Sequence, residues 1–314
     1  APHGTTILLP SLAIATSGLL WGIWWIPLRW LEGSGLTGDW AGVALYAATT
    51  AVLTPFVLLR PSALSLFGRD LLLIGILSGL AFTTWNHALI AGDVVRVTLL
   101  FYLSPIWGTA LGFVVFRDPV SLLRVVSIVT GLAGAAVVLG FDRGIPLPRS
   151  IAEWMALGSG LLFALAAVCS RQAPQVSGLH KTFLNAVFAG LGALAFALLL
   201  PAAPSPAFFS FSDSVGPIAV CLLWQIPVTW AVLWGASRLD AGRLGILLLL
   251  EVMAAAMSAA ILTDEPFGWR EATGCVLIIA AGLIEGADGL RARAPAVRRA
   301  AEGPEVAAGS GSPQ

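Results

Sequence analysis

The sequence predicts an all-α polytopic membrane protein with ten transmembrane helices in two inverted five-helix repeats. Hydrophobic residues make up 58% of the 314 residues and charged residues only 11%, less than half of the roughly 25% found in soluble domains. The apolar residues form runs of membrane-spanning length, and the two halves of the chain share motifs in the same order. Soluble enzymes and nucleic-acid-binding proteins are excluded, because so little charge cannot cover a core of this size.

Each apolar run is long enough to cross a bilayer, which takes about 20 residues in a helix. Charged residues, prolines and glycine clusters separate the runs. No run alternates apolar and polar residues at every second position, the pattern of membrane β-strands. The expected helices cover residues 8–29, 40–59, 71–91, 95–116, 120–140, 152–171, 182–201, 215–236, 243–262 and 268–287.

The loop charges orient these helices, because Lys and Arg accumulate on the cytoplasmic side. With the N-terminus in the cytoplasm, 12 of the 17 basic residues lie inside and 5 lie outside. The loop 202–214 contains neither Lys nor Arg and is expected outside. We therefore expect a protein of the inner (plasma) membrane with both termini in the cytoplasm. Residues 290–314 are rich in Ala, Gly, Pro and charge, and are expected to be a disordered cytoplasmic tail.

The sequence shows no sign of a cofactor, a metal site or a catalytic centre. Cys169, Cys221 and Cys275 lie inside apolar runs, without a CxxC pattern. The chain contains no HExxH, GxSxG or P-loop motif. We therefore expect neither enzymatic activity nor direct use of ATP. The single lysine, Lys181, lies at a run end, which argues against carriers of phosphorylated substrates, since these need cationic groups within the membrane.

Matching motifs relate the two halves of the chain. Each half contains five runs, an odd number, so the second half must enter the membrane from the opposite side. This inverted repeat is typical of secondary transporters, whose substrates bind near the midplane. The repeats are expected over residues 1–145 and 146–289. At a shift of 147 residues, Asp93-Val-Val-Arg96 falls on Asp240-Ala-Gly-Arg243 and Asp118-Pro119 falls on Glu265-Pro266; at a shift of 142, Ser17-Gly-Leu-Leu-Trp21 falls on Ser159-Gly-Leu-Leu-Phe163.

Four acidic residues of these motifs are expected to cap helices. Asp93 and Asp240 directly precede apolar runs, where a carboxylate can accept hydrogen bonds from free backbone N–H groups. Asp118 and Glu265 each precede a proline, which suits the first position of a helix because its missing N–H has no partner there.

Ten spans, two repeats, a proline in the fourth span and an acid–proline start to the fifth resemble the drug/metabolite transporter (DMT) superfamily with its EamA-type repeat. Trp21 after two leucines, Trp85, and Tyr102-Leu-Ser-Pro105 are similar to the YddG-type exporters of aromatic amino acids. This resemblance implies export of aromatic and other apolar amino acids by alternating access. Spans 1–4 and 6–9 would then move around a central cavity, with spans 5 and 10 as outer supports. The chain departs from the pattern at Ser104, where an aromatic is expected, and at Val252, where a proline is expected.

Glu251 is the one acidic residue expected near the membrane midplane, about eight residues into the ninth span. A charge there costs about 2.5–3.5 kcal/mol on insertion scales, so it should face a cavity or a partner. Glu251 falls on Ser104 of the first repeat, which predicts that the two lie on pseudo-symmetric sides of one site. An anchor for a substrate ammonium group, a proton carrier and a hydrogen-bonded packing residue are all open roles.

Aromatic and polar residues within the spans complete the candidate site. Aromatic faces hold apolar side chains and attract ammonium groups. Packing against lipid is the alternative role for the tryptophans, and hydrogen bonding between helices is the alternative for His87 and Gln225. The predicted substrate-binding residues are Trp21, Trp85, His87, Tyr102, Ser104, Phe163, Gln225 and Glu251.

The sequence therefore predicts a secondary transporter in the lipid bilayer that carries a small molecule, expected to be an amino acid, and binds no nucleic acid. Monomer and dimer both remain open. One alternative is proton-coupled efflux of lipophilic cations or other small metabolites, driven by Glu251. An alternative of another class is a membrane-embedded, lipid-modifying enzyme with Glu251 and His87 as its acid–base pair.

Overall fold

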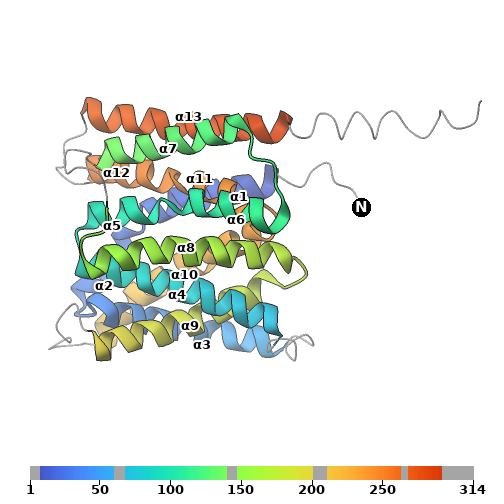
Figure 1. Cartoon of the computed structure of the whole chain (residues 1–314). Coiled ribbons are helices and arrows are strands. Elements are labelled where there is room, and N and C mark those ends of the chain that lie inside the picture. Colours follow the sequence, from blue (N-terminus) through green and yellow to red (C-terminus); the bar gives the residue numbers. More distant parts are fainter. Residues whose placement is uncertain (1–7, 60–67, 140–146, 201–210, 263–267, 292–314) are drawn as a thin grey trace, which may run out of the picture.

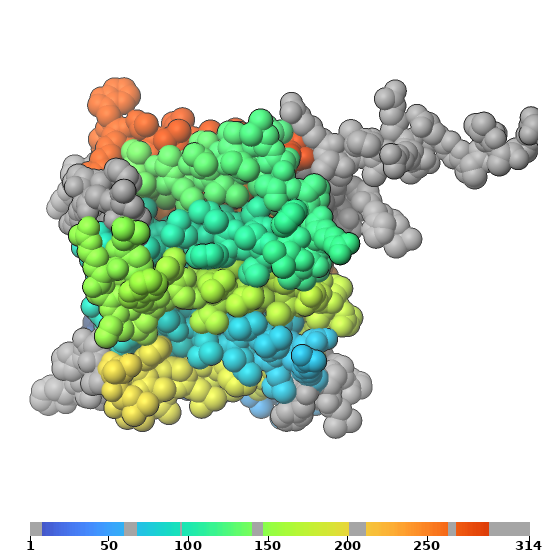
Figure 2. Space-filling model, viewed as in Figure 1, coloured from blue at the N-terminus to red at the C-terminus, as the bar shows by residue number. Residues whose placement is uncertain are grey.

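The structure, a computed structural model, describes residues 8–59, 68–139, 147–200, 211–262 and 268–291. These residues form thirteen helices joined by turns, and they contain no strand. The helices lie alongside one another in one bundle (Figure 1). Side chains of α4 (Arg69–Ala91), α6 (Ser104–Phe116) and α8 (Ile151–Gln172) fill the spaces between the ribbons on the face seen in Figure 2. The prediction of an all-helical polytopic membrane protein is confirmed.

Nine segments of the described chain are long and apolar enough to cross a membrane, and they correspond to the first nine predicted spans. The tenth predicted span is α13, which has 23 residues. It carries charged residues at both ends, is not among the nine, and packs along α7 (Figure 1). The nine segments are α1–α2 (Leu8–Gly22 and Trp25–Gly33), α3 (Gly38–Leu58), α4 (Arg69–Ala91), α5–α6 (Val94–Phe101 and Ser104–Phe116), α7 (Leu122–Leu139), α8 (Ile151–Gln172), α9 (Gly178–Leu199), α10 (Phe211–Ala236) and α11–α12 (Ala241–Leu248 and Leu250–Leu262), followed by α13 (Trp269–Arg291).

Two predicted loops differ from the structure. The seventh span begins at Gly178, where the sequence predicts residue 182, and α10 begins at Phe211 within the predicted loop 202–214. Residues 201–210 of that loop, and the predicted tail beyond Arg291, lie outside the described residues.

Ion pairs at helix ends show that the two halves run in opposite directions. Arg96 at the start of α5 bonds to Glu153 at the start of α8, so these helices begin at one end of the bundle, here named the Arg96 end. Arg124 at the start of α7 bonds to Asp240, which directly precedes α11, so α11 begins at the other end, here named the Arg124 end. Both bounds of α11 lie 147 residues after those of α5. Equivalent helices therefore start at opposite ends, as an inverted repeat predicts.

Three of the spans are broken near the centre of the bundle. The breaks separate α1 from α2, α5 from α6, and α11 from α12. The backbone tightens at each break: the N–H groups of Trp24, Leu103 and Leu249 donate to the carbonyls of Trp21, Leu100 and Ile246, respectively. Pro105 predicts the break in the fourth span, and it lies in the first turn of α6. The eighth span contains Pro217 and Pro227, and α10 continues through both.

Three of the four predicted caps can be compared with the structure. Asp93 and Asp240 cap α5 and α11 by accepting the backbone N–H groups of the residues three positions later, at 3.1 and 2.8 Å. The predicted cap at Asp118 is wrong, because α7 begins at Leu122 and Asp118 instead forms an ion pair with Arg171. Glu265 lies outside the described residues.

Helices α1 and α12 make a close contact that depends on the absence of a side chain at Gly22. A Cβ atom built on Gly22 would clash with the Glu251 carbonyl oxygen and would lie 2.5 Å from the Ala254 Cβ. These neighbours are backbone or a short side chain, so neither can turn aside.

We therefore expect Gly22→Ala to lower the free energy of unfolding by about 1–3 kcal/mol, the usual effect of overpacking. Thermal unfolding of the purified protein in detergent would measure this. Gly158→Ala is the matched control, since a Cβ on Gly158 meets nothing within 4 Å. Equal stability of the two variants would contradict the close α1–α12 contact.

Candidate functional site

A cavity of about 990 Å³ lies among helices of both halves. Asp39, Val94 and Glu271 line it at the Arg96 end, where α3, α5 and α13 begin. Trp21 and Glu251 line it beside the helix breaks. The cavity therefore runs from one end of the bundle to its centre, and its volume lies in the range of small-molecule sites.

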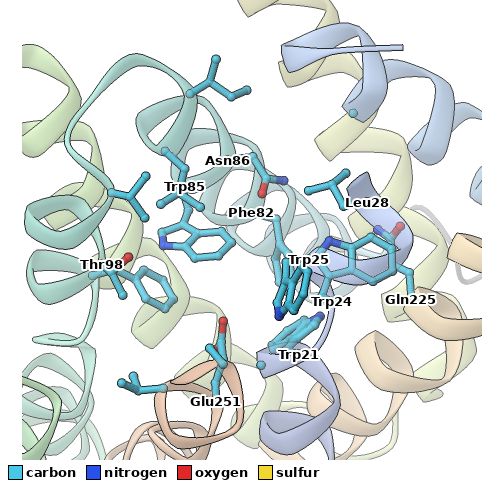
Figure 3. A pocket seen from close by; sticks show the side chains of 18 of the residues that line it. Trp21, Trp24, Trp25, Leu28, Phe82, Trp85, Asn86, Thr98, Gln225 and Glu251 are labelled. Atoms are coloured by element: carbon cyan, nitrogen blue, oxygen red, sulfur yellow. The ribbon is translucent and has the colours of Figure 1, made fainter. Parts of the chain in front are cut away.

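Aromatic rings in contact with one another form one wall of this cavity. Trp21 packs against Phe82, with ring centroids 5.3 Å apart, and Trp85 packs against Phe101 at 5.4 Å. Phe163 connects the two pairs, since its ring lies 6.4 Å from Phe82 and 6.1 Å from Phe101. We name these five residues the aromatic wall. Figure 3 shows that Trp24 and Trp25 approach the same space.

Glu251 lies in the first turn of α12, directly after the break in the ninth span. The Tyr102 hydroxyl, at the break in the fourth span, donates a hydrogen bond to its carboxyl group. The side chain points towards the space beside Trp21, Trp25 and Trp85 (Figure 3). Among the residues that the structure describes, the arginines of the salt bridges pair with other acids, and Lys181 bonds to backbone carbonyls and Ser237. The Glu251 carboxyl is thus available to a cationic ligand.

Polar groups on the opposite side of the cavity are incompletely paired. The Asn86 amide donates to the Tyr46 hydroxyl at 3.1 Å. The Trp85 indole N–H and the Gln225 amide oxygen are buried and have no hydrogen-bond partner among the described residues. An unsatisfied buried polar group costs about 1–3 kcal/mol, so a polar ligand or water would stabilise both.

Six of the eight predicted site residues line the cavity: Trp21, Trp85, Tyr102, Phe163, Gln225 and Glu251. His87 and Ser104 do not. His87 follows Asn86 by one residue, and one helical step turns its side chain towards α3 and α9. There its Nδ1 lies 3.0 Å from the Asp39 carboxylate, and its ring stacks on Phe196 at 4.3 Å.

Ser104 is buried because the start of α6 packs against α11. A Cβ on Gly245 of α11 would lie 2.8 Å from the Pro105 side chain. The prediction that Ser104 and Glu251 face one cavity is therefore wrong for this conformation. The pseudo-symmetric positions are correct, but only Glu251 lies on the open side.

Several cavity residues were not predicted from the sequence: Tyr46, Trp24, Trp25, Phe82, Thr98 and Phe101. A signal existed for Phe82, because Phe82, Trp85, Asn86 and Leu89 follow the spacing of one helix face, and all four line the cavity. Trp25 carried no such signal, since the break after Gly22 changes the rotation of the helix.

The His87–Asp39 pair predicts a structural role for His87. We expect His87→Phe to lower the melting temperature, because a buried polar group that loses its hydrogen-bond partner, here the Asp39 carboxyl, costs about 1–3 kcal/mol. Asp39→Leu combined with His87→Phe should recover part of the loss. Ligand affinity of the folded fraction should stay at the wild-type value. If His87→Phe instead weakens ligand affinity at an unchanged melting temperature, His87 takes part in ligand binding.

Comparisons with known proteins agree with this architecture. No curated protein matches the sequence. Among 29 matching chains of solved structures, one described only as "Crystal structure of protein" has a TM-score of 0.66 and 20% sequence identity, covering 88% of this chain and 98% of its own. Such low identity shows the fold alone. Residues 8–140 match the EamA-like transporter family. This match covers less than half of the chain, so these residues are similar to an EamA-like transporter domain, within a multi-pass membrane protein.

Proposed function

We propose that the protein exports amino acids with aromatic and other apolar side chains, by alternating access around this cavity. The observation that carries the proposal is the Glu251 carboxyl group, bonded to Tyr102 beside an aromatic wall. A carboxylate in an apolar setting forms strong charge-assisted hydrogen bonds with an ammonium group. The neighbouring rings suit an apolar side chain and attract the same ammonium.

An amino acid also carries a carboxylate, which requires hydrogen-bond donors. The unpaired Trp85 indole N–H and the Asn86 amide both line the cavity. They can serve a carboxylate, as can the guanidinium of Arg29, which lines the cavity and stacks on Trp25. This arrangement favours a zwitterion over a simple lipophilic cation, which has no group for these donors.

The direction of transport follows from the orientation that we propose. The Arg124 end carries Arg124, Arg171 and Arg243, and positive residues mark the cytoplasmic side. The cavity would then open away from the cytoplasm in an inner membrane. The repeats proposed over residues 1–145 and 146–289 would together form the carrier.

Proton-coupled efflux of lipophilic cations is the second candidate, and it rests on the same Glu251. A proton carrier and a cation anchor share one requirement, a carboxyl group that both sides of the membrane reach in turn. The proposal of a lipid-modifying enzyme is weaker, because its second group, His87, pairs with Asp39 and does not line the cavity.

Trp21 tests the aromatic wall. We expect Trp21→Ala to weaken the affinity for aromatic amino acids several-fold, since an aromatic pair contributes about 0.5–1.5 kcal/mol beyond its buried area. Binding to purified protein would be measured by calorimetry. Trp154→Ala is the matched control, because Trp154 is 61% exposed on the bundle surface. Unchanged affinity in Trp21→Ala would remove the aromatic wall from the binding site.

Glu251 separates the two transport candidates. If it anchors the ammonium, Glu251→Gln weakens amino-acid binding and abolishes counterflow in reconstituted vesicles, with or without a pH gradient. If it carries protons, the variant keeps counterflow and loses gradient-driven accumulation of lipophilic cations. Glu271→Gln is the matched control, since Glu271 lines the cavity at the Arg96 end. Wild-type binding and counterflow in Glu251→Gln would reject the anchor.

A further inference from the structure

The bundle is closed at the Arg124 end by close packing of α6 against α11. A Cβ on Gly108 would lie 2.6 Å from the Ala241 carbonyl oxygen, and a Cβ on Gly242 would clash with the Thr109 hydroxyl. Gly245 makes a similar contact with Pro105. These helices belong to different halves of the chain, so their contact seals one end of the cavity.

The repeat gives the equivalents of this seal at the open end. At the shift of 147 residues that relates α5 to α11, Gly108 and Pro105 correspond to Ala255 and Val252 of α12. Ala241 and Gly245 correspond to Val94 and Thr98 of α5. All four equivalents line the cavity: Val94, Thr98, Val252 and Ala255.

We infer that α5 and α12 are a second, separated seal, and that Val94 and Thr98 close on Val252 and Ala255 when the Arg124 end opens. This inference rests on the alternating access proposed above. It also explains why Val94, an apolar residue, is 58% exposed at the mouth of the cavity in the conformation described.

The two seals are unequal in packing. The second seal has Ala255 where the first has Gly108, and Val94 where the first has Ala241. Thr98 takes the place of Gly245. The bulkier side chains hold α5 and α12 farther apart than α6 and α11, so contact at the Arg96 end is less tight.

The two seals also differ in charge. Arg124 bonds to Asp240 at 2.5 Å and to Glu285 at 2.9 Å, which ties the start of α11 to α7 of the first repeat. The equivalents of Arg124 and Asp240 are Glu271 and Asp93, which are both acidic and cannot pair with each other. The equivalent ion pair between α5 and α13 therefore cannot form at the Arg96 end, where Arg96 instead joins α5 to α8 through Glu153. Because only the Arg124 end has this brace, the conformation open at the Arg96 end is favoured without substrate.

Paired cysteines test this inference without a substrate. In a background with Cys169, Cys221 and Cys275 replaced by serine, Thr109→Cys with Ala241→Cys reports closure of the Arg124 end. The equivalent pair, Val94→Cys with Ala256→Cys, reports closure of the Arg96 end. A short bis-thiosulfonate reagent would be applied to protein in lipid vesicles. We expect fast cross-linking of the first pair and slow cross-linking of the second.

We expect Asp240→Asn to shift the equilibrium towards the conformation that is closed at the Arg96 end and open at the Arg124 end. Asparagine also caps helices, so α11 keeps its start while the charge pair with Arg124 is lost. Cross-linking of the Arg96-end pair should become several-fold faster, and that of the Arg124-end pair slower. Asp93→Asn, the equivalent change in the first repeat, removes no ion pair with Glu271 and should change both rates less than Asp240→Asn does.

Val94→Cys with Ile261→Cys is the negative pair, because Ile261 is 76% exposed on α12. If the Arg96-end pair cross-links no faster than this negative pair in both backgrounds, the second seal does not exist. Equal response to Asp93→Asn and Asp240→Asn would overturn the unequal bracing. If the wild-type protein binds no amino acid while the cross-linking follows these expectations, the proposed substrate is rejected and the inference of two seals is retained.

Discussion

The cavity depends on a constraint of the membrane interior: backbone N–H and C=O groups there need partners inside the protein. The breaks in three spans leave such groups without their usual partner in the helix. Other groups of the protein then pair with them. At the break in the first span, the Trp24 N–H turns to the Trp21 carbonyl and leaves the Leu20 carbonyl, which accepts the Trp224 indole N–H at 3.0 Å. Broken helices are therefore stable only where side chains of neighbouring helices converge, and the cavity forms at the same place.

These breaks also explain how one carboxyl group is held within the membrane. Glu251 follows one break and Tyr102 occupies another, so the fold brings them together without a continuous helix surface between them. The other described acids of the ion pairs lie near helix ends, where Arg partners offset their charge. Glu251 instead has a phenol as partner and a cavity beside it, which is why its chemistry points to a ligand.

Much of this fold could be predicted from sequence because it depends on composition and on the repeat. Apolar runs fix the spans, and the aspartates at 93 and 240 mark where α5 and α11 begin. The helix breaks are more difficult to predict from the sequence. Pro105 indicates one of them, whereas Ile23 and Leu249 are ordinary helix residues whose position at a break follows from packing between the halves. Neighbours such as Asn86 and His87 differ only by one helical step, and a shift in helix rotation decides which of them reaches the cavity.

The sequence also does not predict that Ser104 lies outside the cavity, because the two repeats differ in conformation at this position. The two repeats place Ser104 and Glu251 at equivalent points, yet the start of α6 is covered by α11 while the start of α12 faces the cavity. Sequence similarity between repeats predicts the positions but not the conformation, because one end of the bundle is closed and the other open. Divergence between the repeats then acts on chemistry: Trp21 and Phe163 keep an aromatic on both sides, whereas a serine opposite a glutamate leaves a single acid. A nearly symmetric fold thus carries an asymmetric cavity, with a single acid on the side of the ninth span.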